Sequence, residues 1–227
     1  MMNPGDLVYI DYIGKIKDTG EIFDLTKEDV AKNEKIYNEK VKYGPLPVVV
    51  DGNFVVKGLD DALKEMRVGD KKTVEIQQEK AFGPRLPELV KMMPESKFKE
   101  QDVDVTPGSF VTINRFRGKI LSMNGGRVTV DFNHPLAGKT LVYEMEIKSE
   151  VKDLKEKISA IYFYFTGIAS DDTEVNVAND VAEIRLKKKH NVASDTKQII
   201  TNVILKWNKD LKKVVFSEVY EEEKATV

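Results

Sequence analysis

Residues 55–70, Val-Val-Lys-Gly-Leu-Asp-Asp-Ala-Leu-Lys-Glu-Met-Arg-Val-Gly-Asp, decide the predicted fold because they contain its central helix. Leu59, Leu63 and Met66 recur at i, i+4 and i+7, which is the spacing of one apolar face on a short amphipathic helix. Gly69 follows the last apolar position, where glycine commonly ends a helix. The stretch therefore predicts one short helix over residues 59–66 and a turn at residues 68–70.

Strand patterns lie on both sides of this helix. Residues 6–17 alternate with Val8, Ile10 and Tyr12 on one face, and Asp18 to Glu21 is typical of a turn into a second strand at residues 22–24. Further strands are predicted at residues 45–50, 72–78 and 140–148. Residues 26–44 are rich in Lys, Glu and Asn, and we expect them to form a solvated excursion from a sheet edge.

The composition changes between residues 84 and 131. Four prolines, at positions 84, 87, 94 and 107, break any long element there. Strands are predicted at residues 109–117, 118–123 and 127–132, with a hairpin turn at residues 124–126. The pattern predicts a compact inserted unit.

The pattern predicts a small α+β module at residues 151–227. Residues 149–157, which lead into it, are predicted to form a linker or a short helix. Aromatic and β-branched residues at 159–165 favour a strand, and the alternation of Ala182, Ile184 and Leu186 predicts another. Ser194 and Asp195 are candidates to cap a helix whose apolar stripe ends at Trp207.

Composition excludes several kinds of chemistry. The 227 residues contain no cysteine and two histidines, which excludes disulfides, thiol nucleophiles and histidine-rich metal sites. Charged residues make up 33% of the chain, but the net charge is −2, so nucleic acid and anionic membranes are not expected as main partners. We expect a soluble, cytoplasmic protein without a membrane span, a metal or a cofactor.

Six short blocks resemble the FK506-binding-protein (FKBP) family of peptidyl-prolyl isomerases, and they occur in the family's order. They span residues 8–14, 20–24, 55–59, 66–70, 81–83 and 134–139. More narrowly, the chain resembles the SlyD-like branch, which carries an insert in the flap, and the long archaeal members with a C-terminal domain. The resemblance implies an antiparallel sheet wrapped on a short helix and an activity that needs no cofactor.

Together, the patterns and the resemblance predict an α+β protein with three domains. The isomerase domain is discontinuous and comprises residues 1–83 plus 132–150. A β-rich insert-in-flap domain is expected at residues 84–131, and the α+β C-terminal domain at residues 151–227.

The resemblance also implies a pocket for the prolyl ring. Its expected catalytic residues are Tyr12, Phe23, Asp24, Val55, Val56, Leu59, Phe82 and Tyr143, and Leu46, Val48 and Leu136 are expected to bind substrate. The N–H of Val56 is expected to donate to a ligand carbonyl, and Asp24, held by Tyr12, to set the polarity at the twisting amide. Leu59 replaces the family's usual tryptophan and Phe82 its usual tyrosine, so we expect weak macrolide binding.

A second substrate surface is predicted on the insert, because methionine and phenylalanine side chains adapt to unrelated partners. The apolar set comprises Leu89, Val90, Met92, Met93, Phe98, Phe110, Phe116 and Met123. The first six are the candidate binding residues, although part of this set must form the insert's own core. Unfolded or partly folded polypeptides that contain proline are the expected partners. A homodimer through the C-terminal domain is a further expectation. The alternative, in which the same apolar residues form the core of a monomer, is nearly as well supported.

Other interpretations remain open at this stage. From periodicity alone, Tyr12, Phe23, Phe82 and Tyr143 are core aromatics. A non-catalytic holdase chaperone with a degenerate isomerase pocket is the alternative function, and Leu59 and Phe82 keep it open. A metallochaperone is disfavoured, since residues 221–227 contain neither His nor Cys.

Overall fold

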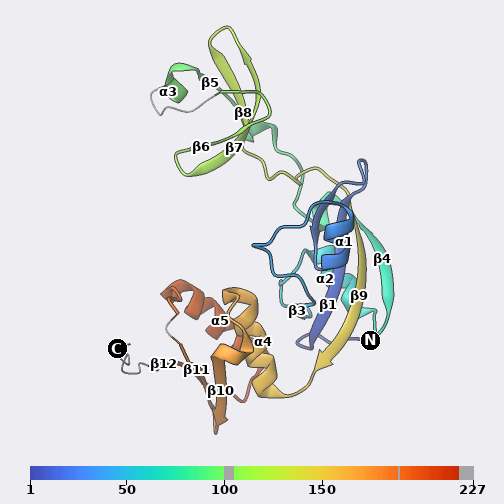
Figure 1. Cartoon of the computed structure of the whole chain (residues 1–227), viewed down its shortest axis with the longest axis vertical. Helices are drawn as coiled ribbons and strands as arrows, with labels where there is room; N and C mark the ends of the chain where they lie inside the picture. The colour runs from blue at the N-terminus through green and yellow to red at the C-terminus, as the bar shows by residue number, and fades with distance from the viewer. Residues whose placement is uncertain (100–104, 189, 220–227) are drawn as a thin grey trace, which may run out of the picture. The chain divides into compact units, whose positions relative to one another are not determined.

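The structure, a computed structural model, describes residues 1–99, 105–188 and 190–219. It divides into two compact units, residues 1–75 with 142–227, and residues 76–141 (Figure 1). We describe each unit by itself and call the second one the insert unit.

The first unit contains a five-stranded sheet. Four of its strands follow the order β2-β1-β9-β4, and the fifth strand, β3, also pairs with β1. The pairs of β1 with β2 and with β3 are antiparallel. The elements of this part are β1 (Leu7–Ile16), β2 (Ile22–Leu25), α1 (Glu28–Asn33), β3 (Leu46–Val49), α2 (Lys57–Lys64), β4 (Lys71–Ile76) and β9 (Leu141–Val151).

The core of this sheet follows the alternation in the sequence. Val8, Ile10 and Tyr12 are buried on β1, and Tyr143, Met145 and Ile147 are buried on β9. Helix α2 buries Leu59 and Leu63, as its spacing predicts. The strands, the hairpin and the short helix α2 are confirmed. The helix is not single, because the excursion at residues 26–44 contains α1, whose Ala31 is buried.

The last part of the first unit holds two helices and a three-stranded sheet. They are α4 (Leu154–Thr166), β10 (Thr173–Ala178), β11 (Val181–Leu186), α5 (Ser194–Trp207) and β12 (Lys213–Glu218). Strand β11 pairs antiparallel with β10 and parallel with β12 (Figure 1). The predicted strand around Ala182, Ile184 and Leu186 is confirmed as β11. The side chains of these three residues are all buried.

The strand predicted at residues 159–165 is wrong, because these residues lie in helix α4. Asp153 caps the helix by accepting a hydrogen bond from the N–H of Glu156 at 3.0 Å, and Gly167 ends it in the left-handed conformation. Ile158, Ile161 and Tyr162 then fall on one buried face. Aromatic and β-branched composition favoured a strand, but two caps and a packed face outweigh that preference.

Two smaller expectations for this region are also corrected. Residues 149–151 belong to β9 and are not a linker, since the strand continues to Val151 before the chain turns at Asp153. Helix α5 is present, but its N-cap is Ala193 and no side chain caps it.

The insert unit contains a four-stranded antiparallel sheet in the order β5-β8-β7-β6. Its elements are β5 (Val90–Pro94), α3 (Ser96–Lys99), β6 (Phe110–Ile113), β7 (Phe116–Asn124) and β8 (Arg127–Asp131). The hairpin turn at Gly125 and Gly126 is confirmed. The expected continuous strand at residues 109–117 is wrong, because Asn114 and Arg115 take positive φ angles and form a second hairpin turn.

Candidate active site

Three aromatic side chains from three strands meet in the first unit. Tyr12 on β1 and Phe23 on β2 each lie 5.7 Å, between ring centroids, from Tyr143 on β9. The Phe23 and Tyr143 rings meet edge to face, an arrangement that the aromatic quadrupole favours. Gly14 makes this approach possible, because a Cβ atom there would lie 2.7 Å from Phe23 and 3.1 Å from Tyr143.

One carboxylate is attached to this aromatic cluster. The hydroxyl of Tyr12 donates to Asp24 Oδ2 at 2.6 Å. Burial raises the pKa of the Tyr12 phenol, and the neighbouring Asp24 carboxylate raises it further. Burial likewise raises the pKa of Tyr143. Both phenols therefore stay protonated at neutral pH, and Tyr12 acts as a donor to Asp24.

The loop before α2 carries Val55 and Val56, and a buried acid fixes it. Asp60, which is 4% exposed, accepts a hydrogen bond from the N–H of Asp51 at 2.7 Å. At the other end of the loop, the Tyr164 hydroxyl of α4 donates to the carbonyl of Phe54. Asp60 and Tyr164 thus position the expected substrate loop, and sequence patterns identified neither of them.

The other expected residues of the first unit differ in accessibility. Val55 and Val56 are half-buried, and Val56 is the N-cap residue of α2. Leu59 is buried, Leu46 is half-buried, and Val48 is fully buried where β3 pairs with β1. Val48 therefore supports the sheet and does not present its side chain to a ligand.

The insert unit holds the expected residues Phe82 and Leu136. The Phe82 ring stacks on His134 with 4.3 Å between centroids and 3° between planes. His134 Nδ1 accepts a hydrogen bond from the N–H of Leu136 at 3.2 Å, so the histidine fixes the turn that contains Leu136. Sequence reasoning predicted only the turn role of His134, because its stacking on Phe82 depends on residues far apart in the chain.

An apolar groove of about 460 Å³ lies on the insert unit. Its lining includes the expected residues Leu89, Met92 and Met93 together with Phe116, another member of the apolar set that the sequence singles out. Met92 and Phe116 are 62% and 69% exposed. We call this surface the apolar groove.

The remaining expected residues of the insert fall elsewhere. Phe98 is buried in the insert's own core with Val111, Ile120, Val128 and Val130, so its expected substrate contact is wrong. Val90 is half-buried on β5, and Phe110 is exposed on β6, outside the apolar groove.

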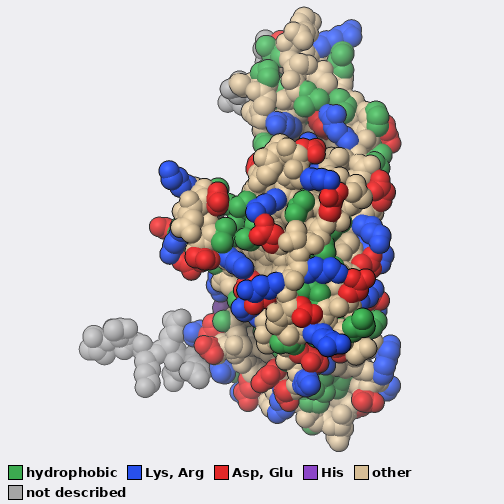
Figure 2. Space-filling model, turned by 90° about the vertical axis from the view of Figure 1, so that its right-hand side faces the viewer, with side chains coloured by type: hydrophobic (Ala, Val, Ile, Leu, Met, Phe, Trp, Pro, Cys, Tyr) green, Lys and Arg blue, Asp and Glu red, His purple; other side chains and the backbone are tan. Residues whose placement is uncertain are grey.

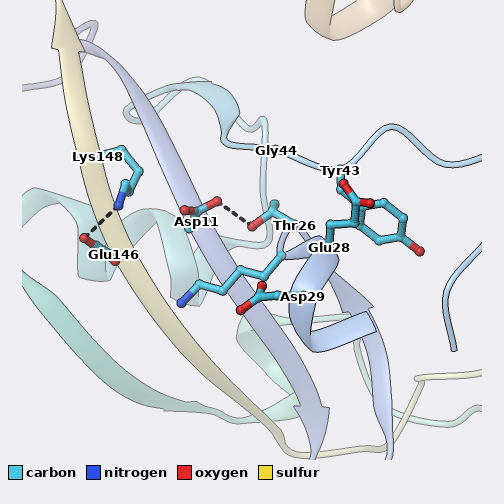
Figure 3. Close-up of a pocket in the computed structure, with 9 residues that line it drawn as sticks. Asp11, Thr26, Glu28, Asp29, Tyr43, Gly44, Glu146 and Lys148 are labelled. Carbon is cyan, nitrogen blue, oxygen red and sulfur yellow. Dashed lines mark hydrogen bonds and ion pairs between the residues drawn. The ribbon is translucent and has the colours of Figure 1, made fainter. Parts of the chain in front are cut away.

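A polar recess of about 360 Å³ also occurs in the first unit (Figure 3). Asp11 precedes Tyr12 on β1, and Glu146 lies between buried Met145 and Ile147 on β9, so the recess is on the sheet face opposite the aromatic cluster. Two of its carboxylates have partners in the lining: Lys148 binds Glu146 at 3.1 Å, and the Thr26 hydroxyl donates to Asp11 at 2.9 Å. Among the residues that the structure describes, no group of three or more His, Cys, Asp or Glu is placed to hold a metal ion.

Basic and acidic side chains are intermixed over the face of the molecule in Figure 2, as the small net charge predicts. Within the described ranges, no helix is long and apolar enough to cross a membrane.

Comparison with known proteins gives the site its context. The chain is 33% identical over 148 residues to a short-type peptidyl-prolyl cis-trans isomerase of Methanocaldococcus jannaschii, covering 65% of this chain and 93% of that protein. It is 40% identical over 104 residues to a probable FKBP-type 16 kDa peptidyl-prolyl cis-trans isomerase of Pseudomonas fluorescens, covering 44% and 67% of the two chains.

Two further similarities extend the comparison. The chain is 29% identical over 137 residues to the FKBP-type isomerase SlyD of Pasteurella multocida, covering 59% of this chain and 66% of that one. A protein family described as FKBP26, IF domain, matches residues 91–136, most of the insert unit. The resemblance noted in the sequence is thereby confirmed: the chain belongs to the FKBP-type peptidyl-prolyl cis-trans isomerase family.

Proposed function

We propose that the aromatic cluster of Tyr12, Phe23 and Tyr143 accelerates Xaa-Pro isomerisation in polypeptide substrates. The observation that carries this proposal is the Tyr12–Asp24 hydrogen bond at the edge of that cluster, in a chain of this enzyme family. Val55 and Val56 are the proposed substrate loop, with Leu59 behind it. The roles of Phe82, Leu136 and Leu46 belong to the same proposal.

The chemistry requires no covalent step. Rotation about an Xaa-Pro bond meets a barrier of roughly 20 kcal/mol because the amide loses resonance as it twists. A dry aromatic surface favours the less polar, twisted amide, and a donor such as the Val56 N–H would bind its displaced carbonyl. Shortening a ~100 s event to ~10 ms requires about 5.5 kcal/mol, which such contacts can supply.

Exchange NMR on a short Xaa-Pro peptide tests the activity. We expect line broadening from faster cis–trans exchange at substoichiometric protein, and loss of that effect in Phe23→Ala, which removes the ring that meets Tyr143 edge to face. If the peptide binds but its exchange rate does not change even at stoichiometric protein, the chain is a holdase with a degenerate pocket.

We also propose that the apolar groove holds unfolded chains and so gives the protein chaperone activity. Two features support this role: Met92 and Phe116 are largely exposed, and the groove between them is lined mainly by apolar side chains. Solvent-exposed apolar surface of this kind is costly in water and typically marks a binding site. Methionine and aromatic side chains adapt to many sequences, which suits varied clients.

Refolding kinetics test the chaperone role. The double variant Met92→Ser plus Phe116→Ser should slow proline-limited refolding of a protein client while leaving isomerisation of a short peptide unchanged. The matched control is Ile36→Ser plus Val41→Ser, which removes two exposed apolar side chains from the first unit. Equal losses on the protein and on the peptide would contradict the assignment of the groove.

The domain division, the dimer and the location are further proposals. We propose an isomerase domain of residues 1–83 plus 132–150, an insert domain of residues 84–131 and a C-terminal domain of residues 151–227. Ile199 on α5 and Val215 on β12 are exposed apolar residues that support a homodimer, which light scattering at high protein concentration tests. A cytoplasmic location is proposed with them.

A further inference from the structure

A second and larger groove, of about 920 Å³, lies on the insert unit, and we call it the cationic groove. Its floor is the face of the insert sheet opposite the insert's core. Phe110 on β6, Lys119 on β7 and Asp131 on β8 are successive cross-strand partners on this face. Ile120 and Val130, which alternate with them, point into the core.

Positive charge dominates this groove. Arg85, Arg117, Lys119 and Lys139 line it, together with the single carboxylate of Asp131. That carboxylate is already engaged: Arg85 donates to Oδ2 at 2.8 Å, and Asn133 donates to Oδ1 from its backbone and its side chain at 2.9 and 2.7 Å. Burial acts to raise the pKa of Asp131, but these hydrogen bonds hold it below the ordinary value.

The other three basic side chains have no such partner among the described residues. Within residues 1–99, 105–188 and 190–219, no carboxylate forms an ion pair with Arg117, Lys119 or Lys139. The Arg117 guanidinium lies over the Phe110 ring, 4.4 Å from its centroid. The groove thus combines unmatched positive charge with exposed apolar surface from Phe110 and Leu121, which are 48% and 40% exposed.

The spacing of these groups suits an extended peptide. Arg117 and Lys119 are two residues apart on β7, so their side chains leave the same face about 7 Å apart. An extended polypeptide repeats its side chains at the same interval. Carboxylates at alternate positions can therefore meet both cations, while a neighbouring apolar side chain contacts Phe110 or Leu121.

We propose that the cationic groove binds extended client segments that carry Asp or Glu at alternate positions beside apolar residues. This inference rests on the proposed binding of unfolded chains and assigns them a preference. The apolar groove then selects segments by hydrophobicity, and the cationic groove selects acidic segments among them.

Fluorescence anisotropy on the full chain tests the preference. The probe is a short, labelled, proline-free peptide with Glu at every second position and Leu and Phe between, so that a prolyl pocket is not involved. The comparison peptide has Gln in place of every Glu. At low salt we expect the acidic peptide to bind about tenfold more tightly, and we expect added salt to remove most of that difference.

Variants locate the preference on the molecule. Arg117→Gln plus Lys119→Gln should reduce the preference from about tenfold to about twofold, with the affinity for the Gln peptide unchanged. The matched control is Lys97→Gln plus Arg115→Gln, which removes the same charges from exposed positions of the insert unit outside both grooves. This control should retain the full preference.

The outcomes distinguish this inference from the underlying proposal that the insert unit binds unfolded chains. If both peptides bind equally, the cationic groove has no acidic preference although client binding stands. If neither peptide binds, both proposals are overturned. An equal loss of preference in the control variant, or tighter binding of a single-stranded oligonucleotide with the same charge as the acidic peptide, also overturns the assignment.

Discussion

Tyr12→Phe removes one hydroxyl group and leaves the aromatic cluster in place. The lost interaction is the hydrogen bond of 2.6 Å to Asp24, and the ring itself is 8% exposed and packs on Tyr143. A hydrogen bond to a charged group contributes about 1.5–3 kcal/mol, and its loss leaves the Asp24 carboxylate without that donor. We therefore expect the free energy of unfolding to fall by about 1.5–3 kcal/mol.

The same change tests whether Asp24 serves isomerisation. If about 1.4 kcal/mol of the interaction acts on the twisted amide, kcat/KM for a short Xaa-Pro peptide should fall about tenfold. Urea denaturation measures the stability, and exchange NMR on the same folded samples measures the rate. Tyr43→Phe is the matched control, because the Tyr43 hydroxyl accepts one exposed hydrogen bond from the Asn38 N–H. Its effects on both quantities should be small.

The variant should also change the response to alkali. The raised pKa of Tyr12 means that the folded state holds this proton more tightly than the unfolded chain does. The resulting stabilisation is complete below the unfolded pKa of about 10 and is lost as the pH rises above it. Tyr12→Phe should therefore lose less stability above pH ~10 than the parent chain. An unchanged rate together with an unchanged alkaline response would refute the role of Tyr12.

Three further substitutions test a close contact in the insert unit, a buried acid on α2 and the N-cap of α4. Gly118→Ala places a Cβ atom 2.5 Å from Val130, so we expect the insert unit to lose about 1–3 kcal/mol of stability, seen as faster amide hydrogen exchange confined to that unit. Asp60→Asn removes a buried anion whose pKa is raised by burial, but it leaves a single oxygen where the carboxylate accepts from the N–H groups of both Asp51 and Asn53, so urea denaturation at neutral pH should find it about 1 kcal/mol less stable than the parent. The folded parent binds the Asp60 proton more tightly than the unfolded chain does, so protonation of Asp60 adds to the free energy of unfolding as the pH falls towards ~4. The variant has no carboxyl group at this position and should lack this contribution. Asp153→Ala removes the N-cap of α4 and should lower the melting temperature through a loss of about 1 kcal/mol, whereas a loss confined to the insert unit would contradict the cap assignment.

Local patterns predicted much of the first unit and part of the insert. The period of two along β1 and β9 and the helical spacing of Leu59 and Leu63 follow from burial of one face, which neighbouring residues express directly. The turn at Gly125 and Gly126 was equally clear, since it needs positive φ angles. The turn at Asn114 and Arg115 was missed because arginine gives no such signal.

The sequence predicted which residues form the site, but not how their side chains are placed. The six blocks contain Tyr12 and Asp24, and the family resemblance implied Tyr143, but burial decided that Val48 and Phe98 are core residues. Long-range contacts brought Tyr164 to the loop at Phe54. The cationic groove was not predicted, because its four basic residues come from three segments of the chain that only the tertiary structure brings together: Arg85 before the sheet, Arg117 and Lys119 on β7, and Lys139 after β8.

The sequence alone determined the alternation of the strands, the short helix α2 and the family of the chain, because each depends on residues that are close together in the sequence. The tertiary structure decided that residues 159–165 form a helix, since Asp153, Gly167 and a packed face outweigh the strand preference of the same side chains. It also decided which apolar residues face solvent and which carboxylates neutralise which cations. These outcomes depend on burial and pairing between distant segments, and a local pattern carries no information about either.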